Sequence, residues 1–266
     1  MNFQGKTVVL TGGASGIGLA AVEGFTALGA KVIFGDINAA AGEKVANDLK
    51  ATFLPLDVTD ASAVTRFRDA AYAQSDNVDV VVNVAGWSKV EHFVNTTPDL
   101  WEKLINLNYT GTLRVVHAFL PKMIARGEGK IVNVASDAGR AGSGGEAVYA
   151  GTKGGVIAFT KSLARETARY KLNINCVCPG PTDTPLLMST PEKQREALVR
   201  AIPFRRFAKP SEVADAIIFF ASARASYLTG QVLSVSGGLS INLKTAFATE
   251  STENTEFNGT ILRNTG

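Results

Sequence analysis

The amino-acid sequence predicts an α/β protein with a doubly wound (Rossmann-type), mostly parallel seven-stranded sheet and helices on both faces. Two observations lead to this prediction. Short apolar or β-branched runs alternate with helical patterns of about ten or more residues along the chain, which is typical of right-handed β-α-β units. The run Val78–Val82 is apolar at nearly every position, as in a strand covered on both faces.

Length and composition fit one domain of this kind. The chain has 266 residues, of which 45% are hydrophobic and 19% are charged, enough for one large core. The net charge of +3, with no basic runs interleaved with aromatic residues, argues against nucleic-acid binding. The sequence shows neither a secretory signal nor an apolar run of about 18 residues, so we expect no membrane span and a cytoplasmic location.

We expect residues 1–243 to form the single domain and residues 244–266 to form a polar C-terminal tail. The tail is rich in Thr, Asn, Glu and Ser, so we expect it to be flexible or strapped across the surface. Cys176 and Cys178 alternate along an expected strand and share one face. We expect them to be buried, reduced thiols, and we expect no metal site, because only His92 and His117 accompany them.

In the first half of the chain, expected strands and expected helices alternate strictly. Gly29 supports the end of the first helix, because glycine often follows a helix C-terminus. The expected strands are Thr7–Leu10, Lys31–Gly35, Phe53–Leu56 and Val78–Val82, and the expected helices are Leu19–Leu28, Ala39–Leu49 and Ser62–Ser75.

The second half adds one long helical region, Asp99–Arg126, which we expect to bend near Gly111. Pro179-Gly180 stops the strand that precedes it. The remaining expected strands are Lys130–Ala135, Asn173–Val177 and Gln231–Val235, and the remaining expected helices are Val148–Tyr170, Pro191–Ala201 and Ser211–Ala221.

A glycine-rich turn, residues 11–18, lies between the first strand and the first helix and carries Gly12, Gly16 and Gly18. It is a variant of the dinucleotide-binding fingerprint with a wider glycine spacing. Glycine lets the backbone approach a pyrophosphate, and the helix start offers free N–H groups and the positive end of its dipole.

Asp36 ends the second strand about 20 residues after this turn, where an acid can accept from the ribose hydroxyls of NAD and would repel the extra phosphate of NADP. Neither neighbour of Asp36 is cationic, so NAD is the expected cofactor. Asp57 also ends a strand. It can accept from the adenine amino group, or it can serve a helix start together with Thr59 and Asp60.

Tyr149 and Lys153 are four residues apart and so share one face of a helix. A nearby ammonium lowers the pKa of a phenol, which makes the pair a candidate acid/base, although such pairs also occur on solvated helix faces. Ser136 follows the fifth strand, at the sheet edge where ligands bind. Its hydroxyl can donate to a substrate carbonyl or cap a helix.

Together these motifs resemble the short-chain dehydrogenase/reductase family, over residues 3–242. The resemblance rests on the glycine turn, Asn83-Val84-Ala85-Gly86, Asn108, Ser136, Tyr149-x-x-x-Lys153 and Pro179-Gly180, in that order. The chain departs from the family at Val84, where a second Asn is usual and where we expect a local packing change. The resemblance implies an NAD(H)-dependent oxidoreductase that interconverts a secondary alcohol and a ketone.

The resemblance also implies a role for each motif residue. Tyr149 would exchange a proton with the substrate, Lys153 would lower the pKa of Tyr149 and bind the nicotinamide ribose, and Ser136 would hold the substrate oxygen. Asn108 would hold a water that connects Lys153 to solvent, and Thr184 would bind the nicotinamide carboxamide. The full set expected to contact the cofactor is Gly12, Ser15, Gly16, Ile17, Gly18, Asp36, Ile37, Asp57, Val58, Asn83, Ala85, Gly86, Tyr149, Lys153, Pro179, Gly180, Thr182 and Thr184.

Stretches beside these residues look like those of dehydrogenases that act on a cyclic 2-hydroxyacyl-CoA. The candidate pocket residues are Trp87, Asp137, Arg140, Ser143 and Glu146, whose alternative role is loop packing. A basic segment, residues 193–209, lies in an expected lid, residues 186–207. It can attract CoA phosphates or simply be a solvated helix. A small free cyclic or aryl alcohol, and a catalytically silent NAD-binding module, are the alternatives.

The resemblance further implies a homotetramer. We expect its interfaces on the two long helices, Asp99–Arg126 and Val148–Tyr170, and on Ser211–Ala221 with the last strand, because large apolar surfaces usually mark interfaces. The apolar residues that suggest these interfaces are Val115, Val116, Phe119, Val156, Ile157, Phe159, Ile217, Ile218 and Phe220.

Overall fold

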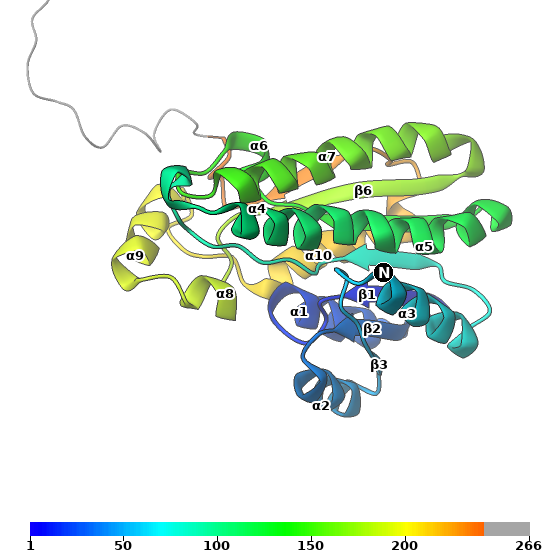
Figure 1. The fold of residues 1–266 in the computed structure, drawn as a ribbon. Coiled ribbons are helices and arrows are strands. Elements are labelled where there is room, and N and C mark those ends of the chain that lie inside the picture. Colours follow the sequence, from blue (N-terminus) through cyan, green and yellow to red (C-terminus); the bar gives the residue numbers. More distant parts are fainter. Residues whose placement is uncertain (242–266) are drawn as a thin grey trace, which may run out of the picture.

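A computed structural model describes residues 1–241 of the chain (Figure 1). The tail expected at residues 244–266 lies outside the described residues, as do residues 242 and 243 of the expected domain.

The core of the structure is one seven-stranded sheet in which all neighbouring strands are parallel. The strand order is β3-β2-β1-β4-β5-β6-β7, so the order of the chain reverses between β1 and β4. In such sheets, ligands bind at the carboxyl ends of the strands beside this reversal. The strands are β1 (Thr7–Thr11), β2 (Lys31–Asp36), β3 (Thr52–Pro55), β4 (Val80–Asn83), β5 (Gly129–Val134), β6 (Leu172–Pro179) and β7 (Val232–Val235).

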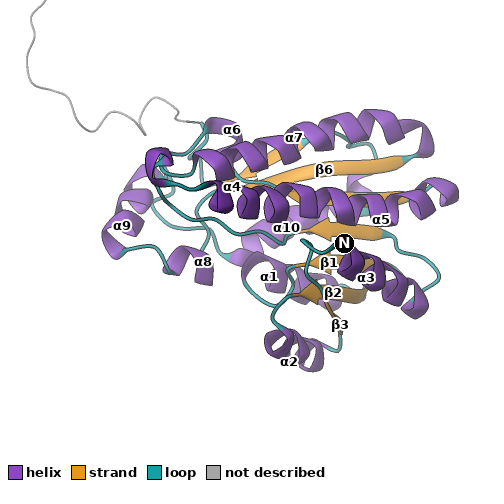
Figure 2. Cartoon of the chain, viewed as in Figure 1, coloured by secondary structure: helices purple, strands orange, loops and turns teal. Residues whose placement is uncertain are grey.

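Helices cover both faces of this sheet (Figures 1 and 2), which confirms the predicted fold class. In the buried core, α1, α2 and α10 pack on one face, and α3, α5 and α7 pack on the other. These helices are α1 (Gly16–Ala27), α2 (Ala39–Leu49), α3 (Ala61–Gln74), α5 (Gly111–Arg126), α7 (Ala147–Thr167) and α10 (Pro210–Ala221).

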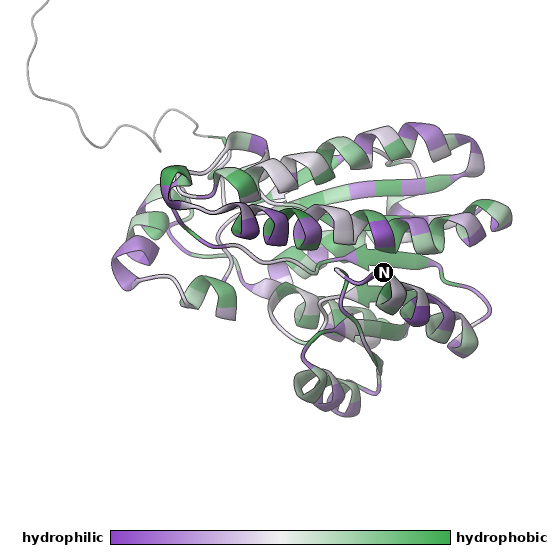
Figure 3. Cartoon of the chain, in the orientation of Figure 1, coloured by the Kyte–Doolittle hydropathy of each residue, from purple (hydrophilic) through white to green (hydrophobic). Residues whose placement is uncertain are grey.

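Successive residues of one strand enter opposite cores, which explains the continuous apolar runs. Val8 and Leu10 pack toward α1 and α10, whereas Val9 between them packs toward α3 and α5. Figure 3 accordingly shows the central strands mostly in the hydrophobic colour, while the helices carry both colours. Both faces of the sheet are therefore buried, as Val78–Val82 predicts.

The long helical region is interrupted just before Gly111, where the sequence predicts a bend. It consists of α4 (Pro98–Ile105), a π-helical turn (Asn106–Thr110) and α5. Gly111 follows the π turn, and a Cβ there would lie 2.7 Å from Cγ2 of Val58. The glycine thus permits a close contact with the loop after β3. Asn108 lies within the π turn, a feature that is frequent at functional sites.

Two short helices were not predicted: α6 (Ala138–Ala141) and α8 (Pro185–Met188). One helical turn is too short to show a 3.6-residue period in the sequence. The charged segment expected at residues 191–201 is confirmed as α9 (Glu192–Ala201). Within residues 1–241, no helix is both long enough and apolar enough to cross a membrane.

The apolar residues that suggested a tetramer interface belong mostly to the core of a single chain. Val115, Val116 and Phe119 on α5 and Ile217, Ile218 and Phe220 on α10 are at most 3% exposed. They face the sheet. The apolar face of a helix that covers a sheet packs against that sheet within one subunit. These side chains therefore give no support for an interface, and that part of the argument is wrong.

Candidate active site

A cleft of about 1700 Å³ lies at the carboxyl ends of the strands. It brings together most of the residues predicted from the sequence. Those that line it are Gly12, Ser15, Gly16, Ile17, Gly18, Asp36, Ile37, Asp57, Val58, Ala85, Gly86, Trp87, Ser136, Asp137, Ser143, Glu146, Tyr149, Lys153, Pro179, Gly180, Thr182 and Thr184.

The glycine turn is shaped so that only glycine fits at its critical positions. Gly12 and Gly16 have φ values of +74° and +53°, which disfavour other residues. A Cβ on Gly12 would lie 2.9 Å from Cα of Ala85, and one on Gly18 would lie 1.8 Å from the carbonyl oxygen of Gly12. The Ser15 side chain makes no capping hydrogen bond to α1, so it leaves the first N–H groups of this helix for an anion such as a pyrophosphate.

Asp36 connects the glycine turn to the end of β2. Its Oδ2 accepts from the backbone N–H of Ala14 at 3.0 Å and its Oδ1 from that of Asn38 at 3.0 Å. The carboxylate is thus fixed at the cleft wall while each oxygen keeps a lone pair for another donor. Asp57 forms a similar local turn, with its Oδ1 accepting from the N–H and hydroxyl of Thr59 at 2.8 and 2.7 Å.

Tyr149 and Lys153 lie one turn apart on α7, in the cleft wall. The ammonium of Lys153 is 5.8 Å from the ring centroid of Tyr149 and donates to the carbonyl oxygen of Val134 at 2.9 Å. Ser136 lines the same wall, and its Oγ also accepts from the N–H of Ala138 at 3.2 Å. The two roles weighed for this serine are therefore compatible.

The charge state of the pair differs from the sequence-based expectation. Burial, only partly offset by a hydrogen bond with Ser136, raises the pKa of Tyr149 to about 12. Burial also lowers the pKa of Lys153 to about 8. The pKa of Tyr149 therefore lies above its ordinary value and not below it, contrary to the expectation, because desolvation disfavours the charged forms of both groups.

Three predicted residues do not line the cleft. Asn83 is buried, and its amide donates to Oδ1 of Asn133 at 2.8 Å, while the neighbouring Val84 packs against the core. Arg140 points to Ser234 on β7. Asn108 is fully buried behind the wall. A motif places a residue near a site, but the side chain's direction follows from the strand or helix that carries it.

Asn108 braces the loop that follows β4. Its Oδ1 accepts from the N–H of Trp87 at 3.0 Å, and its Nδ2 donates to the carbonyl of Trp87 at 2.8 Å. Gly86 fills the gap between this amide and the lysine, since a Cβ there would lie 2.8 Å from Oδ1 of Asn108 and 3.2 Å from Nζ of Lys153. The loop, Asn108 and Lys153 therefore pack as one unit.

We expect Gly86→Ala to lower kcat about tenfold or more, because the added methyl group displaces Lys153 or the loop. Steady-state kinetics and thermal unfolding check this, with Gly144→Ala as the matched control because a Cβ at Gly144 meets no atom within 4 Å. Equal kinetics for both variants would contradict the expectation.

The segment expected as a lid, residues 186–207, lines the cleft through Gln194, Ala197 and Leu198 of α9. The sequence did not reveal the wall contributed by the segment after β7, where Leu239 and Ser240 line the cleft. These residue types carry no motif, and only the folding of distant segments brings them together. Lys103 of α4 also lines the cleft, with its ammonium 4.4 Å from the ring centroid of Trp87.

Four of the six cations of the basic segment already have partners in the chain, among them Arg200, whose Nη1 lies 3.7 Å from a carboxylate oxygen of Glu196. Arg206 forms a bidentate ion pair with Glu212, with N–O distances of 2.6 and 2.7 Å. Arg195 donates to the carbonyls of Met188 and Thr190. Arg200 is the member of residues 193–209 whose charged side chain lines the cleft. The solvated-helix alternative therefore describes most of these cations.

The site fits a nicotinamide dinucleotide. The glycine turn has the close backbone approach that a pyrophosphate requires, and Asp36 can accept from ribose hydroxyls. Tyr149, Lys153 and Ser136 would lie beside the reacting end of such a cofactor, in the same cleft.

Comparisons with known proteins identify the family of this chain. The sequence model of a family described as Enoyl-(Acyl carrier protein) reductase matches residues 12–240. The chain is 40% identical to a 3-oxoacyl-(acyl-carrier-protein) reductase of Thermotoga maritima, over 91% of this chain and 100% of that protein. It is 39% identical to an acetoacetyl-CoA reductase of Synechocystis, over 89% and 97%. The crystal structure of levodione reductase superimposes with a TM-score of 0.86 at 28% identity and covers 90% of this chain and 99% of that one.

Proposed function

This chain belongs to the short-chain dehydrogenase/reductase family and is an oxidoreductase, and we propose that it interconverts a secondary alcohol and a ketone with NAD(H). The observation that carries the proposal is the cleft that gathers Tyr149, Lys153 and Ser136 with the glycine turn and Asp36. A silent NAD-binding module would have no need for this hydroxyl and ammonium set. A bound nicotinamide ring would supply or accept the hydride.

Each residue of the chain has a distinct task in this proposal. Tyr149 gives its hydroxyl proton to the ketone oxygen in reduction and, as phenolate, takes it back in oxidation. Ser136 donates to the same oxygen and stabilises the negative charge that develops there. Lys153 adds positive charge beside the phenol and is placed to bind the ribose of the cofactor. Asn108 fixes the loop beside Lys153, and the water that it would hold stays a prediction.

We expect opposite pH dependences in the two directions. With its pKa near 12, Tyr149 is protonated at neutral pH and ready to donate, so reduction should not depend on its ionisation there. Oxidation needs the phenolate, so its kcat/KM should rise about tenfold per pH unit up to about pH 8 and level off above it, where Lys153 loses its proton. Reduction should fall above about pH 8, where Lys153 loses its proton. Lys153→Arg keeps the charge and should move that fall to higher pH, whereas a pH-independent oxidation rate would contradict the assignment.

For the substrate, we propose a thioester with the reacting oxygen on the carbon β to the thioester carbonyl. The best single candidate is 2-hydroxycyclohexanecarboxyl-CoA, because stretches around Trp87, Ser136 and Pro181 look like the dehydrogenase of that compound. Oxidation of its ring alcohol gives a 3-oxoacyl thioester, which is the compound class named for the relatives from Thermotoga and Synechocystis. Trp87 offers a flat apolar wall to the ring.

Lys103 and Arg200 are the cations best placed for the phosphates of such a thioester, since both line the cleft. The alternative substrate is a small free cyclic or aryl alcohol, for which these charges are incidental. The test is the absorbance of reduced nicotinamide with 2-hydroxycyclohexanecarboxyl-CoA, a straight-chain 3-hydroxyacyl-CoA, the free hydroxy acid and 1-phenylethanol. Turnover of neither thioester, with the free compounds preferred, would reject the thioester assignment but leave the hydride-transfer chemistry standing.

Lys103→Met combined with Arg200→Met refines this test. Under the thioester proposal, KM for the CoA substrate rises and kcat changes little, and the effect shrinks as salt screens the charges. Arg206→Met is the matched control, because Arg206 does not line the cleft and is tightly paired with Glu212.

We also propose a homotetramer in the cytoplasm. The support for assembly comes from large exposed side chains other than those first suggested. These are Phe93 and Val94 before α4, Ile105 at the end of α4, Tyr227 before β7 and Leu233 on β7. We expect light scattering at micromolar concentration to return the mass of four chains. A monomer mass would exclude this proposal.

A further inference from the structure

We propose that Asp137, Arg140 and Ser234 form a clamp that holds α6 against α7 and thereby positions Ser136 and Lys153. The inference rests on the proposed function, because Ser136 and Lys153 take their roles from it. None of its three parts is a catalytic residue in this proposal, and all three act through their neighbours.

Hydrogen bonds tie the loop after β5 to the last strand of the sheet. The hydroxyl of Ser234 on β7 donates to Oδ1 of Asp137, and Arg140 donates through Nη1 to the oxygen of the same hydroxyl. The backbone N–H of Asp137 donates to the carbonyl of Pro179, at the end of β6, at 3.0 Å. Asp137 is therefore held by the ends of two neighbouring strands.

The charge of Asp137 makes the clamp costly to break. Its side chain is only 7% exposed, and within the described residues Oδ2 has no hydrogen-bond partner. A buried carboxylate needs hydrogen bonds and opposite charge nearby. Ser234 supplies the hydrogen bond, and through the same hydroxyl it links Asp137 to the guanidinium of Arg140.

The clamp acts on the active site because α6 packs directly against α7. A Cβ on Gly139 would lie 2.6 Å from the carbonyl carbon of Lys153 and 2.7 Å from the nitrogen of Gly154, so the two backbones touch. Ser136 joins the same unit, because its carbonyl accepts from the N–H of Gly139 at 3.0 Å. A shift of α6 must therefore move Ser136, Lys153 or both.

Arg140 and Ser234 act at a distance from the substrate. Neither lines the cleft, whereas Asp137 does so beside Ser136. A loss of turnover on changing Arg140 or Ser234 therefore comes through position and not through a lost contact with ligand. Because positions of reacting groups matter on the scale of about 1 Å, we expect a large effect on kcat and a small one on cofactor binding.

The test compares Ser234→Ala with Ser234→Thr, which keeps the hydroxyl on a strand that accepts β-branched residues. We expect Ser234→Ala to lower kcat about tenfold, with KM for NAD within about twofold, and Ser234→Thr to restore most of the activity. Ser226→Ala, at an exposed serine outside the cleft, is the matched control and should leave the kinetics unchanged.

A double-mutant cycle separates a clamp from two unrelated contacts. If Ser234 and Arg140 act as one unit, Ser234→Ala with Arg140→Met should lower kcat no more than either single change, whereas independent effects would multiply. Should Ser234→Ala fail to fold, Arg140→Met and Arg140→Lys carry the same comparison. Multiplying effects, or full activity in Ser234→Ala, would overturn the clamp. Full activity in Tyr149→Phe would instead overturn the proposed function.

Discussion

Tyr149→Phe should reduce turnover by about a thousandfold, roughly 4 kcal/mol of barrier, while the affinity for NAD stays close to normal. The change removes one oxygen and leaves the ring that packs in the cleft wall. Without that hydroxyl, Ser136 can still donate a hydrogen bond to the ketone oxygen, but the proton that Tyr149 gives to this oxygen in the proposed reaction is lost. The measurements are kcat with the best substrate and NADH binding by fluorescence.

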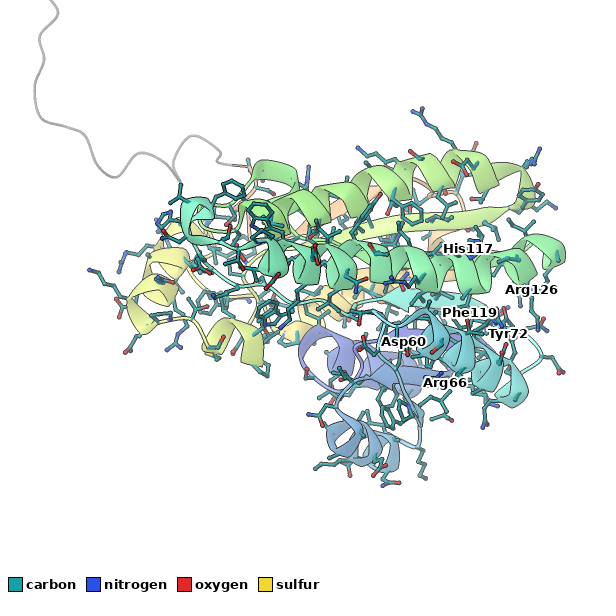
Figure 4. All side chains as sticks on the ribbon, viewed as in Figure 1. Asp60, Arg66, Tyr72, His117, Phe119 and Arg126 are labelled. Atoms are coloured by element: carbon teal, nitrogen blue, oxygen red, sulfur yellow. The ribbon has the colours of Figure 1, made fainter. Side chains whose placement is uncertain are left out.

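Tyr72→Phe is the matched control, since it removes a phenol oxygen outside the cleft. Tyr72 lies on α3 beside Phe119, on the α3–α5 side of the molecule and far from α8 and α9 (Figure 4), and it does not line the cleft. We expect it to keep wild-type kinetics. If Tyr149→Phe retained a tenth of the activity, Tyr149 would not be the proton donor.

The main residues of this site could be predicted from the sequence because most of them lie at the ends of strands. Gly12, Asp36, Ser136 and Gly180 all lie where a parallel strand ends. Since the carboxyl ends of parallel strands meet at one edge, the alternating pattern of strands and helices alone brings these residues together. For Tyr149 and Lys153, the helical period also predicts that the two side chains share one face of the helix. Local sequence therefore determines both the fold class and the approximate location of the cleft.

Properties that depend on burial or on distant partners could not be predicted in this way. The pKa of Tyr149 depends on how far the folded chain desolvates its phenol, and no spacing rule gives that. The sequence predicts Arg140 as a pocket residue. In the structure its partner is Ser234 on β7, which lies 94 residues further along the chain. The apolar residues of α5 and α10 look the same in sequence whether they face the sheet or another subunit.

The second large effect concerns the cofactor. We expect the wild-type protein to prefer NAD over NADP by about a hundredfold in kcat/KM, because the carboxylate of Asp36 stands where a 2′-phosphate would have to lie and repels its charge. The structure makes Asp36→Ala a poor test, since it also removes the acceptor for Ala14 and Asn38 at the glycine turn. Asp36→Asn removes the charge and keeps one oxygen as an acceptor.

Ile37→Arg should complete the change of preference when it is added to Asp36→Asn. Ile37 lines the cleft and is 77% exposed, so an arginine there can reach a phosphate without disturbing the core. We expect Asp36→Asn to raise kcat/KM for NADP and to weaken that for NAD, and the double variant to prefer NADP. Ile37→Arg alone is the control for charge without the loss of the carboxylate, and it should move the preference less. A wild-type protein that used NADP better than NAD would show that Asp36 serves the glycine turn and not the ribose.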